Sequence, residues 1–305
     1  MRILITGASG LLGLNTALES ANQHTVFGQV NRNAIQTEAF TVLNADLVEP
    51  GAVDRILDRT QPDWVIHCAA LANLEACEDD PDLAWKLNTT LPRNLAEQCR
   101  NGGARLLHVS TDAVFDGRVG GYSEVDQPNP QGTYSQTKYQ AELAVAEVNP
   151  DAIIARVNLF GWSLYGKRSL AEFFLNNLSA GKLVMGFTDI IFCPLLVNDI
   201  AHIFIQMLEN GLSGLYHVLS IDSMSKYEFG VAIARRFGLN EDLIEPKSVI
   251  DANLKAVRSP NLTLKVDKLI HDLGEIPPNI STGIDRFYKL YQQGYPQMLL
   301  GLVNN

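Results

Sequence analysis

The amino-acid sequence predicts an α/β fold in which a Rossmann-type, doubly wound parallel sheet carries a smaller C-terminal α/β lobe. Two observations predict this fold. Short runs of apolar and β-branched residues alternate with stretches of helical spacing through the first half of the chain, as in parallel strands joined by crossover helices. In addition, a glycine-rich turn follows the first of these runs and opens the first helical stretch.

The expected strands of the sheet are several short apolar runs. Some of them are apolar on both faces, which indicates that helices cover the sheet on each side. The strands are expected at 2–6, 24–28, 39–44, 64–69, 105–110 and 152–157. The helices between them are expected at 11–21, 51–59, 80–100 and 134–147.

The pattern loosens after Val157, where glycines divide the sequence into short segments. We therefore expect a dinucleotide-binding Rossmann domain over 1–157 and mainly a substrate-binding lobe over 158–305. A helix at 199–211 and a strand at 214–220 are expected to rejoin the first domain. The later helices are expected from a capping box at 225–228 to Phe237, and over 281–294.

Composition and charge exclude several classes of protein. With 46% hydrophobic and 19% charged residues, the chain resembles globular proteins with a sizeable core. Its net charge of -10 argues against nucleic-acid binding, which needs a basic surface. No apolar run approaches the ~18 residues of a membrane span, and no signal peptide precedes the first strand, so a cytoplasmic location is expected. The four cysteines and six histidines show no metal-binding spacing, so no metal is expected.

The turn TGASGLLG, residues 6–13, has the GxxGxxG spacing of a phosphate-binding loop. Gly7 permits the tight turn, Gly10 lets the backbone approach a pyrophosphate, and Gly13 allows the helix to pack closely on the strand. The helix N-terminus adds unpaired N–H groups and a positive dipole. We expect this segment to bind a dinucleotide cofactor through Gly7, Ser9, Gly10, Leu11, Leu12 and Gly13.

The end of the second strand bears on which dinucleotide is bound. An acidic residue there would hold the ribose diol of NAD, but this chain has the sequence Gln29-Val30-Asn31-Arg32. Arg32, beside Asn31, is suited to pair with a 2′-phosphate. The sequence thus favours NADP, with NAD as the alternative, and an exposed loop arginine without a ligand is the plain structural interpretation.

Tyr134 and Lys138 are separated by four residues in a predicted helix, so they share a face about one turn apart. An ammonium group near a phenol favours its ionised form and moves its pKa toward the working range of an acid or base. This pair occurs by chance in many helices. Here it follows a strand that ends on Ser110 and Thr111, whose hydroxyl can donate to the substrate oxygen that a tyrosine protonates.

The glycine turn, the strand ending in Ser110-Thr111 and the Tyr-Lys pair together resemble the extended short-chain dehydrogenase/reductase family over nearly the whole chain. The resemblance implies NAD(P)-dependent oxidoreductase activity, with Thr111, Tyr134 and Lys138 as catalytic residues and the last two also contacting the cofactor. It further implies cofactor contacts by Asp46 and Leu47 after the third strand, by Cys68, Ala69 and Ala70 after the fourth, and by Asn88.

Within that family, STDAVFDG at 110–117 is similar to the STDYVFDG segment of dTDP-4-dehydrorhamnose reductases. Those enzymes reduce the 4-keto group of a nucleotide-activated deoxysugar. The resemblance makes Asp112 a substrate contact, Tyr134 the proton donor and Lys138 its electrostatic partner. Related dehydratases follow the threonine with Asp-Glu, whereas Ala113 follows Asp112 here, which argues against dehydration and leaves reduction or epimerisation.

The chain also departs from these reductases. Leu159 replaces their pocket tryptophan, with Trp162 three residues later, and the run at 190–196 is more apolar, so it lines a different sugar or packs as core. The segment at 258–269 is similar to their C-terminal segment, although Ser259 intervenes before the proline. Arg258 is the candidate cation for a nucleotide diphosphate, and an exposed structural arginine is the alternative.

Another class of function shares this scaffold. Regulatory beta subunits of methionine adenosyltransferase resemble the same reductases, and they use a nucleotide pocket in assembly rather than turnover. The three catalytic residue types favour an enzyme, but such relatives can retain them. Members of the family often dimerise through the helix that bears Tyr134 and Lys138, which leaves a homodimer open.

Overall fold

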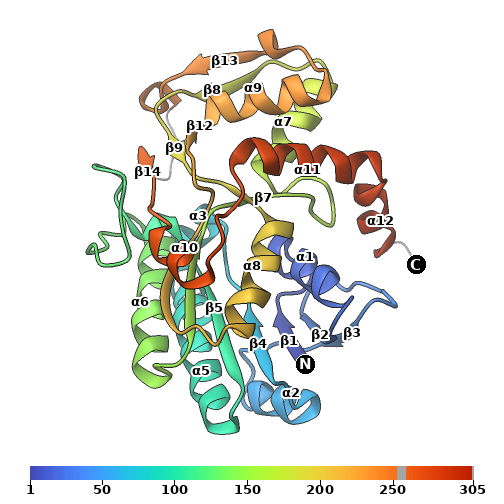
Figure 1. The fold of residues 1–305 in the computed structure, drawn as a ribbon, viewed down its shortest axis with the longest axis vertical. Coiled ribbons are helices and arrows are strands. Elements are labelled where there is room, and N and C mark those ends of the chain that lie inside the picture. The colour runs from blue at the N-terminus through green and yellow to red at the C-terminus, as the bar shows by residue number, and fades with distance from the viewer. Residues whose placement is uncertain (253–258, 304–305) are drawn as a thin grey trace.

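The fold was analysed in a computed structural model, which describes residues 1–252 and 259–303. Its centre is a seven-stranded parallel sheet in the order β11-β6-β5-β4-β1-β2-β3 (Figure 1). This confirms the predicted Rossmann-type architecture. The strands are β1 (Arg2–Thr6), β2 (Thr25–Val30), β3 (Thr41–Asn44), β4 (Trp64–His67), β5 (Arg105–Thr111), β6 (Ile153–Val157) and β11 (Gly214–Val218).

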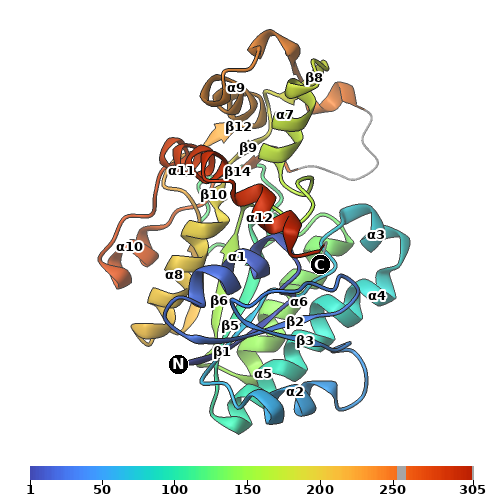
Figure 2. The ribbon, with the colours of Figure 1, turned by 90° about the vertical axis from the view of Figure 1, so that its right-hand side faces the viewer.

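Helices cover both faces of this sheet (Figure 2). On one face α1 (Leu11–Ser20) packs against α8 (Val197–Glu209), and on the other α5 (Leu91–Gly102) packs against α2 (Ala52–Thr60) and α6 (Thr133–Val148). The central strands are consequently buried on both sides, and β4 and β6 contain buried residues only. Covering both faces explains why these strands read as continuous apolar runs in the sequence.

The prediction of a single helix over 80–100 is wrong, because the structure divides this region into several elements. It consists of α4 (Pro81–Trp85), a π-helical turn η1 (Lys86–Thr90) and α5, and a further helix α3 (Leu74–Asp79) precedes them. The division has a physical reason in Pro92, which has no N–H to donate to the carbonyl of Asn88 four residues earlier. The Leu91 N–H bonds instead to the carbonyl of Lys86, five residues back, which widens the turn.

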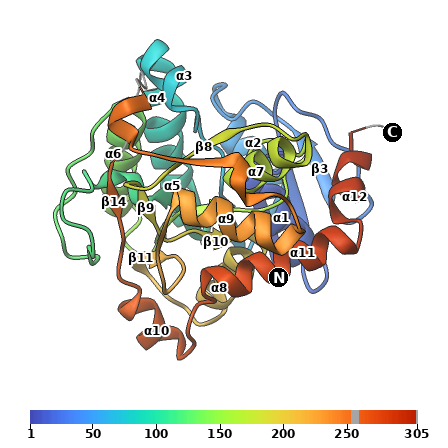
Figure 3. The same ribbon diagram turned by 90° about the horizontal axis from the view of Figure 1, so that it is seen from above.

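Part of the chain beyond β6 forms a group of small elements at the top of Figure 1. Two capping boxes, at Ser169 and Ser225, start α7 (Leu170–Ser179) and α9 (Lys226–Phe237). Seen from above, α9 lies across this group (Figure 3). Its short strands pair as β13 (Ile244–Lys247) with β8 (Val184–Phe187), and as β12 (Met224–Ser225) and β14 (Asn261–Leu262) on β9 (Ile191–Phe192).

The C-terminal part of the chain forms three helices, of which the sequence predicts only the middle one. They are α10 (Asp267–Leu273), α11 (Ile280–Gln292) and α12 (Tyr295–Gly301). The apolar run at 190–196 packs as core, since Ile190, Phe192 and Leu196 are all buried and no residue of the run lines the cavity described below. Within the described residues no helix is long and apolar enough to cross a bilayer.

Candidate active site

A cavity of about 690 Å³ opens where the carboxyl ends of β1 to β6 meet. In open α/β sheets this edge is the usual place for a ligand. The cavity brings together nearly all the residues that the sequence predicts for a cofactor and for chemistry, although they come from five separate strand ends and from α6. They are Gly7, Ser9, Gly10, Leu11, Leu12, Gly13, Asn31, Arg32, Asp46, Leu47, Cys68, Ala69, Ala70, Thr111, Asp112, Tyr134 and Lys138.

The glycine turn forms a cradle that larger residues would fill. Gly7 has a φ of +68°, and a Cβ there would lie 2.9 Å from the backbone of Ala69. A Cβ on Gly13 would lie 2.4 Å from the carbonyl oxygen of Gly7, so the first helix can approach the strand only with glycine. This open backbone at the start of α1 fits a pyrophosphate.

Gln29, which the sequence analysis assigns no role, holds the cradle in place. Its Oε1 accepts a hydrogen bond from the Gly7 N–H (3.0 Å), and its Nε2 donates to the carbonyl of Ala45 (2.7 Å). The side chain at the end of β2 thus braces two strand ends. Asn31 and Arg32, a little further along the chain, also line the cavity.

Thr111 and Tyr134 lie together in the cavity, at the end of β5 and in the first turn of α6. Burial raises the pKa of Tyr134 to about 12, a change that hydrogen bonding with Thr111 opposes and that Asp112 and Cys77 reinforce. The expected lowering of this pKa by Lys138 is therefore wrong for this arrangement. A phenol with a raised pKa remains protonated at neutral pH and is available as a proton donor.

The Lys138 ammonium group is buried beside the strand rather than bonded to the tyrosine. Its Nζ donates to the carbonyl of Val109 (2.7 Å) and lies 3.4 Å from Nε2 of His108. Burial lowers the pKa of Lys138 to about 8, and the nearby Glu142 and Cys68 oppose the shift. The ammonium group stays mostly charged at neutral pH because its lowered pKa is still above 7.

Asp112 is buried at the same strand end. Burial raises its pKa to about 6, against hydrogen bonds from Asn158 and Thr111. The Asn158 Nδ2 donates to its Oδ2 at 2.6 Å, and Leu159 follows on the cavity wall. Trp162, by contrast, is buried away from the cavity and stacks on Phe287. Arg258, the other predicted substrate contact, lies outside the described residues.

Asn88, which was predicted to contact the cofactor, does not line the cavity. It lies buried in the π-helical turn. Its Oδ1 accepts from the Leu71 N–H (2.8 Å), and its Nδ2 donates to the Leu71 carbonyl (3.0 Å) and to Thr137 Oγ1 (3.2 Å). Asn88 thus ties the loop after β4 to the helix that bears the tyrosine and the lysine.

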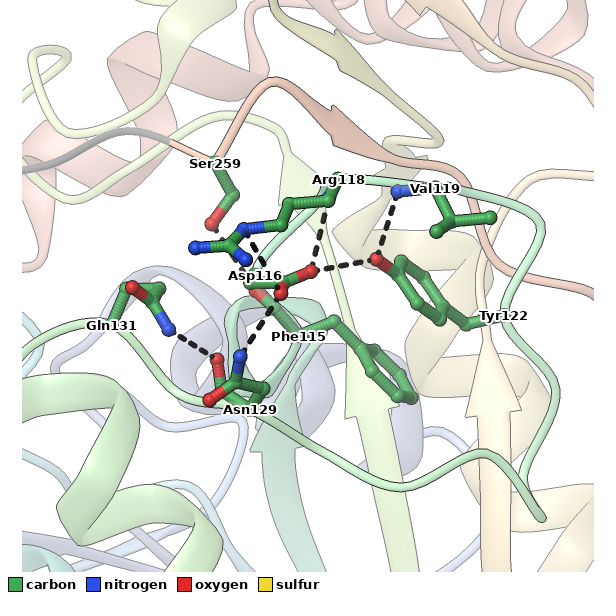
Figure 4. A network of polar contacts seen from close by, with 8 residues as sticks. All are labelled: Phe115, Asp116, Arg118, Val119, Tyr122, Asn129, Gln131 and Ser259. Atoms are coloured by element: carbon green, nitrogen blue, oxygen red, sulfur yellow. Dashed lines mark hydrogen bonds and ion pairs between the residues drawn. The ribbon is translucent and has the colours of Figure 1, made fainter.

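The second half of STDAVFDG anchors a loop. Val114 and Phe115 are fully buried. The Asp116 carboxylate accepts hydrogen bonds from the Tyr122 hydroxyl (2.9 Å) and the Asn129 amide (3.0 Å), as Figure 4 shows. The Ser259 hydroxyl donates to the carbonyl of Phe115 (3.1 Å), which ties the loop to the segment before β14.

The sequence model of one family, described as the RmlD substrate binding domain, matches residues 1–293. The chain belongs to this family. Two relatives illustrate the range of the family. A probable low-salt glycan biosynthesis reductase, Agl14, from Haloferax volcanii is 32% identical over 92% of this chain and 95% of its own. Methionine adenosyltransferase 2 subunit beta from Mus musculus is 31% identical over 88% of this chain and 81% of its own.

Solved structures have the same fold as this member of the RmlD substrate binding domain family. The dTDP-4-dehydrorhamnose reductase of Bacillus anthracis, solved in complex with NADP, superposes with a TM-score of 0.81 at 25% identity. The match covers 94% of this chain and 98% of the other.

Sequence reasoning missed some residues on the cavity wall of this family member. Asn158 is hidden in the run after β6, where no known motif marks it. Arg168 follows a loop whose position over the cavity depends on tertiary packing, since the Asn15 amide in α1 donates to the carbonyl of Trp162 (3.0 Å). The one available signal was the capping box beginning at Ser169, which fixes where α7 begins.

Proposed function

We propose that this protein is an NADPH-dependent reductase of the 4-keto group of a nucleotide-activated deoxysugar, similar to dTDP-4-dehydrorhamnose reductase. The observation that carries the proposal is that Thr111, Tyr134 and Lys138 line the same cavity as the glycine cradle. Membership of the RmlD substrate binding domain family supports it. The proposal includes the division into a Rossmann domain over 1–157, joined by 199–220, and mainly a substrate lobe over 158–305.

In the proposed reaction the nicotinamide, when bound, supplies a hydride to the carbonyl carbon. Tyr134, held protonated by its raised pKa, donates a proton to the carbonyl oxygen. Thr111 donates a hydrogen bond to the same oxygen, and the Lys138 charge stabilises the negative charge that develops there. Asp112 presents a buried carboxyl and Asn158 a half-buried amide to the sugar. Arg258 stays our candidate for the nucleotide diphosphate.

NADP is the proposed cofactor, with NAD as the alternative. Of the described residues that line the cavity, Asp46 and Asp112 are the carboxylates, and neither lies at the end of β2, where a carboxylate would hold the NAD ribose. Arg32 stands there instead. The NADP complex of the Bacillus anthracis reductase supports this choice.

The direct test incubates the protein with NADPH and a dTDP-4-keto-deoxysugar and follows absorbance at 340 nm. We expect oxidation of NADPH within minutes, and Tyr134→Phe should lower kcat by roughly 100-fold because the general acid is lost. Tyr139→Phe is a matched control on the same helix, outside the cavity wall. If the wild-type protein binds NADPH but reduces no sugar nucleotide, the reductase proposal fails.

A second candidate is a regulatory subunit, which the 31% identity to methionine adenosyltransferase 2 subunit beta supports. It predicts cofactor binding without turnover, together with a change in the activity of a methionine adenosyltransferase when the two proteins are mixed. The reductase assay and this mixing assay give opposite results for the two candidates.

We also propose a homodimer, formed through α6 and its neighbours. A groove between α4, η1, α5 and α6 is lined by Trp85 and Leu143, which are each 48% exposed. Leu143→Arg should convert a dimer into a monomer in light scattering, and a wild-type monomer would rule the dimer out.

Free cysteines support a cytoplasmic location, and the charge of -10 supports the absence of nucleic-acid binding.

A further inference from the structure

Two buried histidines lie beneath the Lys138 ammonium group, and the proposed chemistry does not use them. His67 ends β4, and His108 lies beside it in β5, where the two residues are register partners. Their rings are 5.4 Å apart between centroids and inclined by 25°. Both side chains are at most 1% exposed. They are therefore shielded from solvent and directly behind a catalytic residue.

His67 is hydrogen-bonded to Thr6 at the end of β1. The Thr6 hydroxyl oxygen accepts from the Ala69 N–H (3.3 Å) and lies 2.7 Å from Nδ1 of His67. The hydroxyl oxygen has a second lone pair, so it can accept a hydrogen bond from Nδ1 or donate one to it. Nε2 of His67 has no partner among the described residues.

The lysine fixes the tautomer of His108. An ammonium group donates three hydrogen bonds and accepts none, so Nε2 of His108, 3.4 Å from the Lys138 Nζ, must be the acceptor. The proton of this ring is therefore on Nδ1. Burial lowers the pKa of His67 to about 3 and that of His108 well below its ordinary value, so both rings are neutral. A cationic ring would instead repel the lysine.

We propose that His108 is a positioning residue: as a neutral acceptor it holds the Lys138 ammonium against the Val109 carbonyl and leaves one N–H for the cavity. The inference rests on the proposed function, in which Lys138 serves catalysis. Two of the three N–H groups are accounted for by Val109 and His108, and Lys138 itself lines the cavity. The third is thus available to a ligand.

The proposal predicts how His108 controls the charge of the lysine. A hydrogen bond to a charged group stabilises the charged form, and losing it should lower the pKa of Lys138 by roughly one unit. Activity that needs the ammonium falls as pH rises through this pKa, which is about 8 in the wild-type protein. Without the acceptor, the alkaline fall in activity should begin at lower pH.

Three variants separate hydrogen bonding from packing. A glutamine amide oxygen reaches the place of the histidine Nε2, whereas an asparagine amide reaches only that of Nδ1. In His108→Leu and His108→Asn we expect the alkaline limb of kcat/KM to move down by roughly one unit, which lowers the rate at pH 8 about fivefold relative to wild type. In His108→Gln the limb should stay where it is in the wild-type protein.

The same titration can be read without turnover, from the NMR shift of the Lys138 side chain in protein labelled at lysine Cε and assigned with Lys138→Met. His67→Gln, which leaves the Lys138 contact intact, is the control, and thermal melts verify folding of every variant. An unmoved Lys138 titration in both His108→Leu and His108→Asn, or equal rescue by asparagine and glutamine, overturns the inference. If the wild-type protein turns over no sugar nucleotide, the proposed function fails, and the NMR titration still decides the role of His108.

Discussion

Two buried charged groups lie one turn apart on α6, and the protein surrounds them differently. The Glu142 carboxylate accepts hydrogen bonds from the Ser110 hydroxyl (2.5 Å) and from Nε and Nη2 of Arg156 (2.9 and 2.7 Å). The Lys138 ammonium has only neutral acceptors, at Val109 and His108, and forms no ion pair within the described residues. The Glu142 charge is neutralised by Arg156, whereas the Lys138 charge remains available to a ligand.

This difference separates a structural charge from a functional one. A buried ion pair with all its hydrogen bonds is specific but leaves nothing for a ligand. A buried cation without a carboxylate is costly to the folded state, and proteins keep such groups mainly at functional sites. The contrast has measurable consequences for stability and for ligand binding.

Removing the partner of Glu142 should have the largest effect on stability. Arg156→Met leaves a buried carboxylate unpaired, and we expect the free energy of unfolding to fall by about 3 to 5 kcal/mol in urea titrations. Arg93→Met is the control, because the Arg93–Glu97 pair on α5 is exposed and should contribute under about 1 kcal/mol. Equal effects of the two changes would contradict the structural role of Glu142 and Arg156.

Removing the Lys138 charge should raise the free energy of unfolding rather than lower it. Burial holds its folded-state pKa at about 8, below the 10.5 of an ordinary lysine, so the charged form destabilises the folded protein by up to about 3 kcal/mol below pH 8. Lys138→Met should therefore unfold at higher urea concentration at pH 7 while losing reductase activity. Between pH 8 and 10.5 the unfolded chain binds more protons at this lysine than the folded protein does. The wild-type protein therefore gains stability as the pH rises through this range, and the variant does not.

Buried neutral histidines should make the protein sensitive to acid. Burial and the Arg156 charge lower the pKa of His217 to about 3, so below pH 6.5 the unfolded chain binds a proton that the folded protein does not. Stability then falls as pH falls, by about 2 kcal/mol per such histidine between pH 6.5 and 5. His217→Phe should remove that share of the pH dependence, as urea titrations at the two pH values can show. An unchanged slope would mean that His217 is protonated in the folded state.

Arg168 extends the comparison to the rim of the cavity, because its guanidinium, like the Lys138 ammonium, has no carboxylate partner in the part of the chain that the structure describes. We expect Arg168→Ala to weaken the binding of NADPH or of dTDP about tenfold, since a charge-assisted bond to phosphate is lost. Separate titrations identify which ligand is affected. Lys167→Ala, a neighbour that does not line the cavity, is the control and should leave both affinities unchanged.

The sequence predicted most of the fold because its strands and its glycine turn are local patterns. Each of the six runs predicted to be strands before residue 158 overlaps a strand of the sheet, and the ends agree within two residues. The division of 80–100 was missed, since the effect of Pro92 on the carbonyl of Asn88 is visible only once the helix is built. Several of the small elements after Val157 are too short to show a period.

The cavity residues were predictable for the same reason, through motifs at strand ends. The environment of Lys138 was not, because His67 and His108 each read as ordinary core residues and meet only through strand register. The expected effect of Lys138 on the pKa of Tyr134 failed similarly, since burial is a property of the packed protein. Spacing predicts which residues share a helix face, and packing decides which of them interact.

The contacts of Asp116 and Ser259 also bear on the order in which the protein is completed during synthesis. The loop after β5 is fastened by a hydrogen bond between residues 144 positions apart, from Ser259 to Phe115. Strands β1 to β6 and the glycine cradle emerge from the ribosome well before Ser259, and N-terminal units generally fold first. A nascent chain can thus form its glycine cradle early, but the loop after β5 gains this anchor only after Ser259 has been made.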